Sequence, residues 1–184
     1  MKVLLASASP RRRELIKKLF DEFDVAAYPA DENYKGATPE DTVSTIASRK
    51  LAAVTASEAY DLVVASDTLV YMDGKYYGKP SDEEEAVSML TELSGRTHTV
   101  YSAVAVRYKG KTYTAIDATR VLFRDLTPDE IRNYVSSHDC LDKAGAYAVQ
   151  DGVTVASYEG SYDNVVGLPT EKLRSLINGL ITEN

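Results

Sequence analysis

The strand pattern at residues 99–123 constrains the fold more than any other feature of the sequence. Polar and apolar residues alternate through 99–107, Lys109 and Gly110 form a turn, and a second strand pattern follows at 112–123. Two such runs around a short turn predict an antiparallel hairpin, whereas strands and helices interleave in the rest of the chain. The sequence therefore predicts one α/β domain over residues 1–184 with a mixed β-sheet.

Apolar runs and cap residues predict the remaining elements. Further strands are expected at residues 3–6, 23–30, 62–65, 69–71 and 153–158. Helices are expected after the cap Ser9 and at residues 38–54, 81–93, 127–136 and 169–180. Ser81 is the predicted cap of its helix, and the polar run 66–68 is expected to interrupt a strand.

Charge and cysteine content exclude several classes of protein. The net charge of −7 disfavours a broad electrostatic surface for DNA or RNA, so we expect no nucleic-acid partner. Cys140 is the only cysteine, which excludes an internal disulfide and is typical of a reducing compartment. No stretch approaches the ~18–20 apolar residues of a membrane span. We therefore expect a soluble, cytoplasmic protein with no membrane partner.

The run from Ser7 to Arg13 lies where a buried strand leads into a helix. The first N–H groups of a helix lack partners within the helix and carry the positive end of its dipole, which favours anions. Serine hydroxyls add donors, and an arginine in the first turn can hold two phosphate oxygens. The alternative is that Ser9 only caps the helix and the arginines face solvent.

Acidic residues at two loop or strand positions are candidates for catalysis. Asp67 follows an apolar strand, where α/β proteins often place catalytic groups, and it could hold Mg²⁺ or accept a proton from an attacking water. A turn stabilised by this side chain is the alternative. Glu32, with Asp31 beside it, could supply a second metal carboxylate, although such loop pairs are usually just solvated.

Two further segments contain candidate binding residues. Lys79, in Gly78-Lys79-Pro80, would stand near a helix N-terminus, but taken alone this motif is better explained by a surface lysine in a turn. Small residues at 144–148 suggest that the backbone approaches another group closely, and Gln150 follows them. Its amide presents a donor beside an acceptor, which is complementary to the imide edge of uracil or thymine. A tightly packed strand, with Gln150 serving only backbone groups, is the alternative.

Taken in order, these segments resemble the Maf family of nucleoside triphosphate pyrophosphatases. The matching stretches span nearly the whole chain, and their ordered combination is highly specific. They are residues 4–12, Asp31-Glu32, the helix containing Lys50, Ser66-Asp67-Thr68, Gly78-Lys79-Pro80, 93–98, 142–147 and 166–169.

The resemblance implies a two-lobed α/β fold with a long mixed β-sheet flanked by helices and a central nucleotide cleft, related to the inosine triphosphate pyrophosphatases. It also implies a homodimer and metal-dependent cleavage, with Mg²⁺ or Mn²⁺, of a nucleoside triphosphate to the monophosphate and pyrophosphate. By position, Asp67 matches the family's catalytic base, and Glu32 matches a metal or water partner. Ser7, Arg11, Lys50 and Lys79 match polar positions around the phosphates.

Within the family, Arg12, Thr68 and Gln150 match the residues that mark the branch hydrolysing dTTP and UTP. Modified pyrimidine nucleotides are a further substrate class to test. The chain departs from the family at Ala8, where glycine or a small polar residue is frequent, and in a shorter segment between Gln150 and Gly167. The second departure lies beside the proposed base-reading residue and bears on selectivity more than on catalysis.

Two alternative functions stay open. One keeps the enzyme class but makes 7-methyl-GTP or a non-standard purine nucleotide the substrate. The other makes the protein a nucleotide-binding regulator of cell division with little catalysis. The carboxylate of Asp67 argues against this second alternative, because a protein that only binds phosphate gains nothing from an anion near its ligand unless a metal is present.

Overall fold

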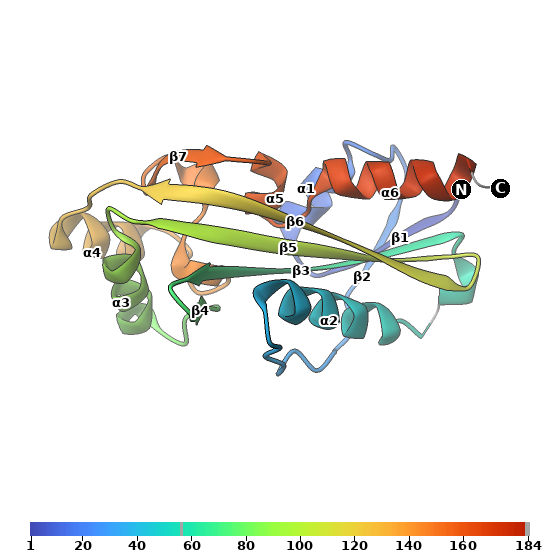
Figure 1. Ribbon diagram of the computed structural model, residues 1–184, viewed down its shortest axis with the longest axis horizontal. Helices are drawn as coiled ribbons and strands as arrows, with labels where there is room; N and C mark the ends of the chain where they lie inside the picture. Colours follow the sequence, from blue (N-terminus) through green and yellow to red (C-terminus); the bar gives the residue numbers. More distant parts are fainter. Residues whose placement is uncertain (56, 183–184) are drawn as a thin grey trace. The chain divides into compact units, whose positions relative to one another are not determined.

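A mixed β-sheet flanked by helices organises the chain, and the computed structural model describes residues 1–55 and 57–182 (Figure 1). The strands are β1 (Val3–Ala6), β2 (Asp24–Ala26), β3 (Leu62–Met72), β4 (Lys75–Tyr77), β5 (Thr97–Tyr108), β6 (Lys111–Phe123) and β7 (Val155–Glu159). The α-helices are α1 (Pro10–Ile16), α2 (Pro39–Ala52), α3 (Glu83–Leu93), α4 (Pro128–Ser137), α5 (Tyr162–Val166) and α6 (Thr170–Thr182). Short 3₁₀ helices are η1 (Ser57–Ala59), η2 (Ala144–Ala146) and η3 (Val149–Asp151).

The hydrogen-bonded strand order is β2-β1-β3-β5-β6-β7, and β4 pairs with β3. β1 is parallel to both β2 and β3, whereas β7 is antiparallel to β6 and β4 is antiparallel to β3. The predicted α/β class and mixed sheet are therefore confirmed. The hairpin predicted at 99–123 is present as β5 and β6, with positive φ angles at Lys109 and Gly110 in its turn.

Contacts between residues divide the chain into two compact units. Unit 1 contains residues 1–68, 101–117 and 163–184, and unit 2 contains residues 69–100 and 118–162. The boundaries fall inside β3, β5 and β6, so each unit is built from several separate stretches of the chain. A central nucleotide cleft stays a prediction.

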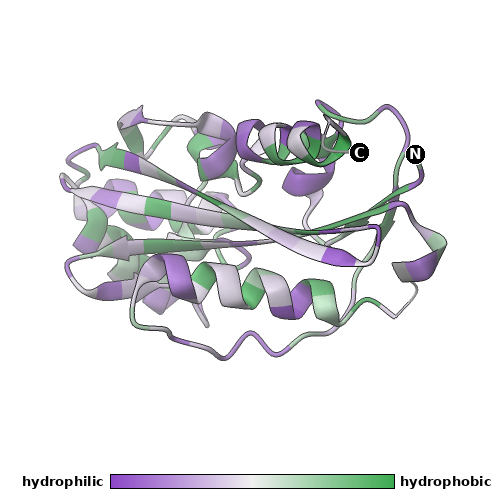
Figure 2. Cartoon of the chain, turned by 45° about the vertical axis from the view of Figure 1, so that its right-hand side comes forward, coloured by the Kyte–Doolittle hydropathy of each residue, from purple (hydrophilic) through white to green (hydrophobic). Residues whose placement is uncertain are grey.

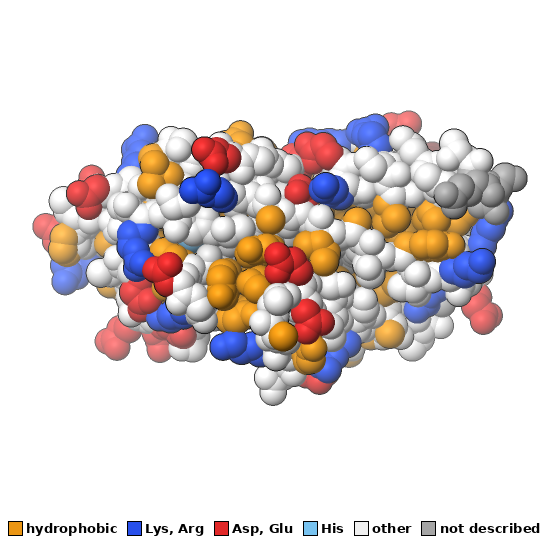
Figure 3. Space-filling view, viewed as in Figure 1, with side chains coloured by type: hydrophobic (Ala, Val, Ile, Leu, Met, Phe, Trp, Pro, Cys, Tyr) orange, Lys and Arg blue, Asp and Glu red, His pale blue; other side chains and the backbone are white. Residues whose placement is uncertain are grey.

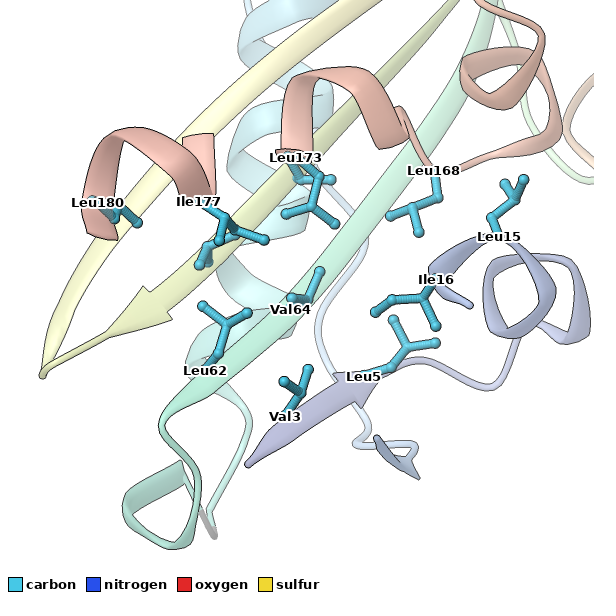
Figure 4. Close-up of a cluster of buried hydrophobic side chains, with 12 residues drawn as sticks. Val3, Leu5, Leu15, Ile16, Leu62, Val64, Leu168, Leu173, Ile177 and Leu180 are labelled. Carbon is cyan, nitrogen blue, oxygen red and sulfur yellow. The ribbon is translucent and has the colours of Figure 1, made fainter. Parts of the chain in front are cut away.

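The core of unit 1 lies between the sheet and two helices. Side chains of β1, β3 and β5 pack against α1 and α6, as Figure 4 shows for Leu5, Ile16, Val64 and Leu173. α2 covers the opposite face of these strands (Figure 1). Hydrophilic and hydrophobic residues alternate along α2 and α6 (Figure 2), as expected for helices with one buried face.

Unit 2 contains β4, β7 and the helices α3 and α4. α3 contacts both α4 and η2. In the same unit His98, Phe123 and Tyr147 form an aromatic cluster with edge-to-face ring contacts. No helix in the described part of the chain is long and apolar enough to cross a membrane.

Three predicted elements differ from those observed. The strand expected at 23–30 has only three residues, because its partner β1 ends at Ala6 and Pro29 has no N–H for a ladder bond. The break expected at 66–68 is absent, since β3 continues through those residues. The cap of α3 is Asp82 rather than Ser81, because Oδ1 of Asp82 accepts the Glu85 N–H at 2.8 Å.

Three other segments also differ from the predictions. Residues 144–151, for which a packed strand was the alternative, form η2 and η3 instead. The sequence patterns did not predict the five-residue α5. The expected strand at 153–158 begins two residues later, as β7.

Candidate active site

Asp67 lies in the middle of β3 and is almost completely buried, with a residue exposure of 7%. Its Oδ1 atom accepts a hydrogen bond from Nζ of Lys50 at 2.7 Å. A buried carboxylate needs such a partner, because an unpaired charge away from water is costly. The polar residue that was expected to break the strand is therefore accommodated inside it.

Lys50 is held in place by the helix that contains it. α2 begins at the cap Thr38 with Pro39 in its first turn, and its stripe of Val43, Ile46, Ala47 and Leu51 is buried. That burial fixes the rotation of the helix, so Lys50, on its last turn, reaches the carboxylate of Asp67. The same Nζ atom forms an ion pair with Oε2 of Glu32 at 2.9 Å.

Glu32 comes from the segment between β2 and α2, and its side chain is 55% exposed. The neighbouring pair is separate: Arg49 forms an ion pair with Asp31 at 2.9 Å and lies over the ring of Tyr34. One cation, Lys50, thus lies between two carboxylates from different segments of unit 1.

The donor set of this cluster suits a hard divalent cation. Oxygens of Asp67 and Glu32 converge on one point within 2.9 Å of a single Nζ atom. Mg²⁺ is usually bound by one or two carboxylates plus waters and substrate phosphates. Within the described residues there is no group of three His, Cys, Asp or Glu side chains arranged to hold a metal. Phosphates and water would therefore have to supply the remaining ligands.

The turn from β1 into α1 contains the serines of the predicted anion site. Ser7 is buried, and its hydroxyl accepts the backbone N–H of Ser9 at 3.2 Å. Ser9 caps α1 by accepting the Arg12 N–H, as predicted, and Pro10 begins the helix. Arg11 is half-buried in the first turn, whereas Arg13 is exposed.

Arg12 is half-buried and its guanidinium is hydrogen-bonded within the protein, so the alternative of a solvated arginine face is wrong for this residue. Its Nε donates to the carbonyl of Gly167 at 2.7 Å, and Nη2 donates to the Thr68 hydroxyl at 3.1 Å. Burial lowers the pKa of Arg12, and the negative charge of Asp67 opposes that shift. The guanidinium therefore joins α1 to β3 and to the turn before α6.

The sequence patterns did not single out the other members of this network as functional. The Gly167 carbonyl also accepts from the hydroxyls of Ser66 at 3.2 Å and Thr68 at 3.3 Å. Ser102 pairs with the Thr68 hydroxyl at 2.9 Å and donates to the carbonyl of Asn164 at 3.0 Å. Gly167 has φ of +124°, which favours glycine at this position. The only sequence signal for Ser102 is a hydroxyl directly before the apolar run 103–106.

Lys79 and Gln150 belong to unit 2. Lys79 is exposed in the segment after β4, and the preceding Gly78 accepts the N–H of Gly145 at 3.0 Å. Two of the predicted motifs, 78–80 and 142–147, therefore contact each other. Gln150 is exposed in η3, so its amide is not confined to satisfying backbone groups in a packed strand.

His98 is a core residue. Its Nε2 pairs with the hydroxyl of Tyr147 at 2.8 Å, and burial lowers the pKa of His98 to about 4. The imidazole is therefore neutral at physiological pH.

Basic and acidic side chains are interspersed on the face shown in Figure 3. The basic residues of the candidate site are instead concentrated at the ends of elements, at Arg11 and Arg12 on α1 and Lys50 on α2. Local concentration of this kind lets an acidic protein bind a small polyanion.

Comparison with known proteins identifies close relatives of the whole chain. The family model for Maf-like protein matches residues 2–180. The dTTP/UTP pyrophosphatase of Pelotomaculum thermopropionicum is 43% identical over 180 residues, which cover 95% of this chain and 94% of the relative. A Clostridium perfringens protein of the same name is 44% identical over 183 residues, with 94% of each chain covered.

A solved structure of the Staphylococcus aureus Ham1 protein shares the fold. It superposes with a TM-score of 0.57 over the full length of both chains, at 16% sequence identity. At that identity the likeness bears on the fold alone.

Proposed function

Since the chain belongs to the Maf family, we propose that it is a nucleoside triphosphate pyrophosphatase that acts on dTTP and UTP. The reaction consumes one water and releases the nucleoside monophosphate and pyrophosphate. The observation that carries the proposal is the buried Asp67–Lys50 pair, with Glu32 on the same ammonium group. Relatives above 40% identity that bear this activity in their names support the same reaction.

Asp67 is the proposed general base. Its carboxylate is held by one hydrogen bond from Lys50, and we propose that it orients an attacking water and accepts a proton from it. The water oxygen bonds to the α-phosphorus as the bond from that phosphorus to the oxygen bridging the α- and β-phosphates breaks, and pyrophosphate leaves with that oxygen. Ser7, Arg11, Lys50 and Lys79 are the proposed donors to the phosphate oxygens, where they stabilise charge on the leaving group.

Asp67 and Glu32 are the residues proposed to hold Mg²⁺ or Mn²⁺. The ion would supply positive charge to neutralise the triphosphate. The convergence of two hard oxygen donors on one point supports this assignment.

Selectivity for a pyrimidine base is assigned to Arg12, Thr68 and Gln150. The hydrogen bond between Arg12 and Thr68 couples the positions of those two side chains. The exposed Gln150 amide has the donor and acceptor that an imide edge requires. A cytoplasmic location, a homodimer and activity on modified pyrimidine nucleotides are further parts of this proposal.

A panel of nucleotides, assayed for pyrophosphate with and without Mg²⁺, tests the function. We expect dTTP and UTP to be hydrolysed faster than 7-methyl-GTP and the purine nucleotides, and only with the metal present. Preference for 7-methyl-GTP would refute the role of Gln150. Turnover far below ~1 s⁻¹ for every nucleotide would favour a binding protein instead of an enzyme.

The Asp67→Asn variant tests the mechanism in the same assay. We expect a loss of about 10²–10⁴-fold in turnover, because a general base contributes that much. The matched control is Asp129→Asn, which removes an exposed carboxylate in the first turn of α4 and should leave turnover unchanged. Full activity in Asp67→Asn would contradict the assignment.

A further inference from the structure

The position of Lys50 has a consequence for how a metal reaches the site. Its Nζ lies 2.7 Å from Oδ1 of Asp67 and 2.9 Å from Oε2 of Glu32, at the point where the two carboxylates converge. These are the oxygens that the proposed function assigns to the metal. We propose that Lys50 competes with the divalent cation for this carboxylate pair, so that the cation binds tightly only together with the nucleotide.

The short distances prevent the Lys50 ammonium group and the metal ion from binding the same carboxylate oxygens at the same time. A Mg²⁺ ion bound to the same oxygens lies about 2.1 Å from each of them. An ammonium group within hydrogen-bonding distance of those oxygens would then lie only a few ångströms from the ion. Two positive charges at that separation repel each other strongly at the effective dielectric of a protein surface.

Burial makes the ammonium group a strong competitor. The side chains of Lys50 and Asp67 are only 16% and 10% exposed, so water and salt screen their attraction poorly. Displacing Lys50 without offering it another anion would leave a charge unpaired in a nearly buried place, which is costly. Glu32 is 55% exposed and is the more easily released of the two carboxylates.

A triphosphate removes this obstacle because it offers the ammonium group new acceptors. Lysine has a flexible four-carbon stem, so its ammonium group can move between acceptors without movement of the helix. Once Lys50 pairs with phosphate oxygens, the carboxylates of Asp67 and Glu32 become available to the metal. Free metal should therefore bind weakly, and the metal–nucleotide complex should bind well.

Direct titration with Mn²⁺ in the absence of nucleotide tests this inference, with free Mn²⁺ followed by electron paramagnetic resonance. We expect Lys50→Met to bind Mn²⁺ at least about tenfold more tightly than the unmodified protein, since removal of a neighbouring positive charge favours the cation. Arg49→Met is the matched control: it removes the same charge one residue away, from a side chain paired with Asp31. Its Mn²⁺ affinity should rise much less than that of Lys50→Met, because the Arg49 charge is paired with Asp31 and not with the two carboxylates assigned to the metal.

Two further variants locate the effect. Lys50→Gln keeps a polar side chain and should also bind Mn²⁺ more tightly, which guards against a packing defect in Lys50→Met. Adding Asp67→Asn to Lys50→Met should abolish the gain. Equal or weaker Mn²⁺ binding in both Lys50 variants would overturn the inference, as would a gain that survives Asp67→Asn.

This inference rests on the proposed function, and the two fail in different ways. If the unmodified protein hydrolyses dTTP with Mn²⁺ but the Lys50 variants show no gain in affinity, only the competition is wrong. If no divalent metal supports turnover of any nucleotide, the proposed function is wrong, and the premise of the competition is wrong with it.

Discussion

Arg12 lies in the first turn of α1, and its side chain forms hydrogen bonds with two other segments of unit 1. Its position after Ser9 and Pro10 predicts a basic group at a helix start, where it can serve an anion. In the structure two of its N–H groups are used by Gly167 and Thr68. Any effect of Arg12 on nucleotide choice therefore acts at least partly through the shape of this turn.

His98 provides a pH-dependent prediction at the same scale. Burial lowers its pKa from 6.5 to about 4, so between these values the unfolded chain binds a proton that the folded chain does not. The stability that neutral His98 contributes is present above about pH 6.5 and is lost as the pH falls toward about 4. At about 1.4 kcal/mol per pH unit, the full effect across this interval is about 3 kcal/mol.

Urea unfolding of the unmodified protein and of His98→Gln at pH 7 and pH 5 measures this effect. Glutamine can still pair with the Tyr147 hydroxyl but does not titrate. We expect the free energy of unfolding to fall less between pH 7 and pH 5 in the variant. An equal fall in both proteins would mean that other groups cause the acid sensitivity.

At the scale of elements, cap residues and hydrophobic periodicity set most boundaries of helices and strands. Where a boundary differs from the prediction, contacts with residues far along the chain explain it. Thr38 and Thr127 cap their helices as their sequence context predicts. β3 runs through Ser66 and Thr68 because their hydroxyls donate to the Gly167 carbonyl, about 100 residues away. The rule that polar residues interrupt a buried strand fails where such partners exist.

Replacing two glycines with alanine is predicted to change the free energy of unfolding in opposite directions. Gly179 lies in α6 with open space where a Cβ would be, so Gly179→Ala should raise the free energy of unfolding by about 0.5–1 kcal/mol. Gly160 has φ of +126°, and a Cβ there would lie 2.8 Å from the Thr119 hydroxyl. Gly160→Ala should therefore lower the free energy of unfolding by about 1–3 kcal/mol.

Thermal and urea unfolding of the two alanine variants measure both effects. The pair controls for the chemistry of the change, because the same methyl group is added in each case. A gain in stability from Gly160→Ala would show that the strain assigned to that position is absent.

At the scale of the whole molecule, unit 1 depends on stretches from both ends of the chain. Leu173 of α6 is fully buried against β1 and β3 in the unit 1 core (Figure 4). We expect Leu173→Ala to lower the free energy of unfolding by about 2–5 kcal/mol, since it leaves a cavity. Ile181→Ala, in the same helix but 49% exposed, should change it by less than about 0.5 kcal/mol.

Chemical denaturation followed by circular dichroism would measure these changes. Equal losses in the two variants would indicate that α6 is not held through its buried face. A loss confined to Leu173→Ala would show that the buried face of α6 supports the part of the sheet that contains β3, on which Asp67 lies.

Local patterns and ordered motifs in the sequence were enough to predict most of the elements, the mixed α/β class and the family. Periodicity, caps and turn residues act over a few positions, and the ordered motifs are specific enough to identify a family without coordinates. They also named Asp67, Lys50, Glu32 and Arg12 as candidates.

The contacts that connect those candidates arise only in the folded chain. No local sequence pattern indicates that the Lys50 ammonium group lies between Asp67 and Glu32. None indicates that Arg12 donates a hydrogen bond to a carbonyl 155 residues away. Ser102 and Gly167 enter the site for the same reason. Buried polar groups take whichever partners the packing brings within reach, and that choice depends on contacts between segments far apart in the chain.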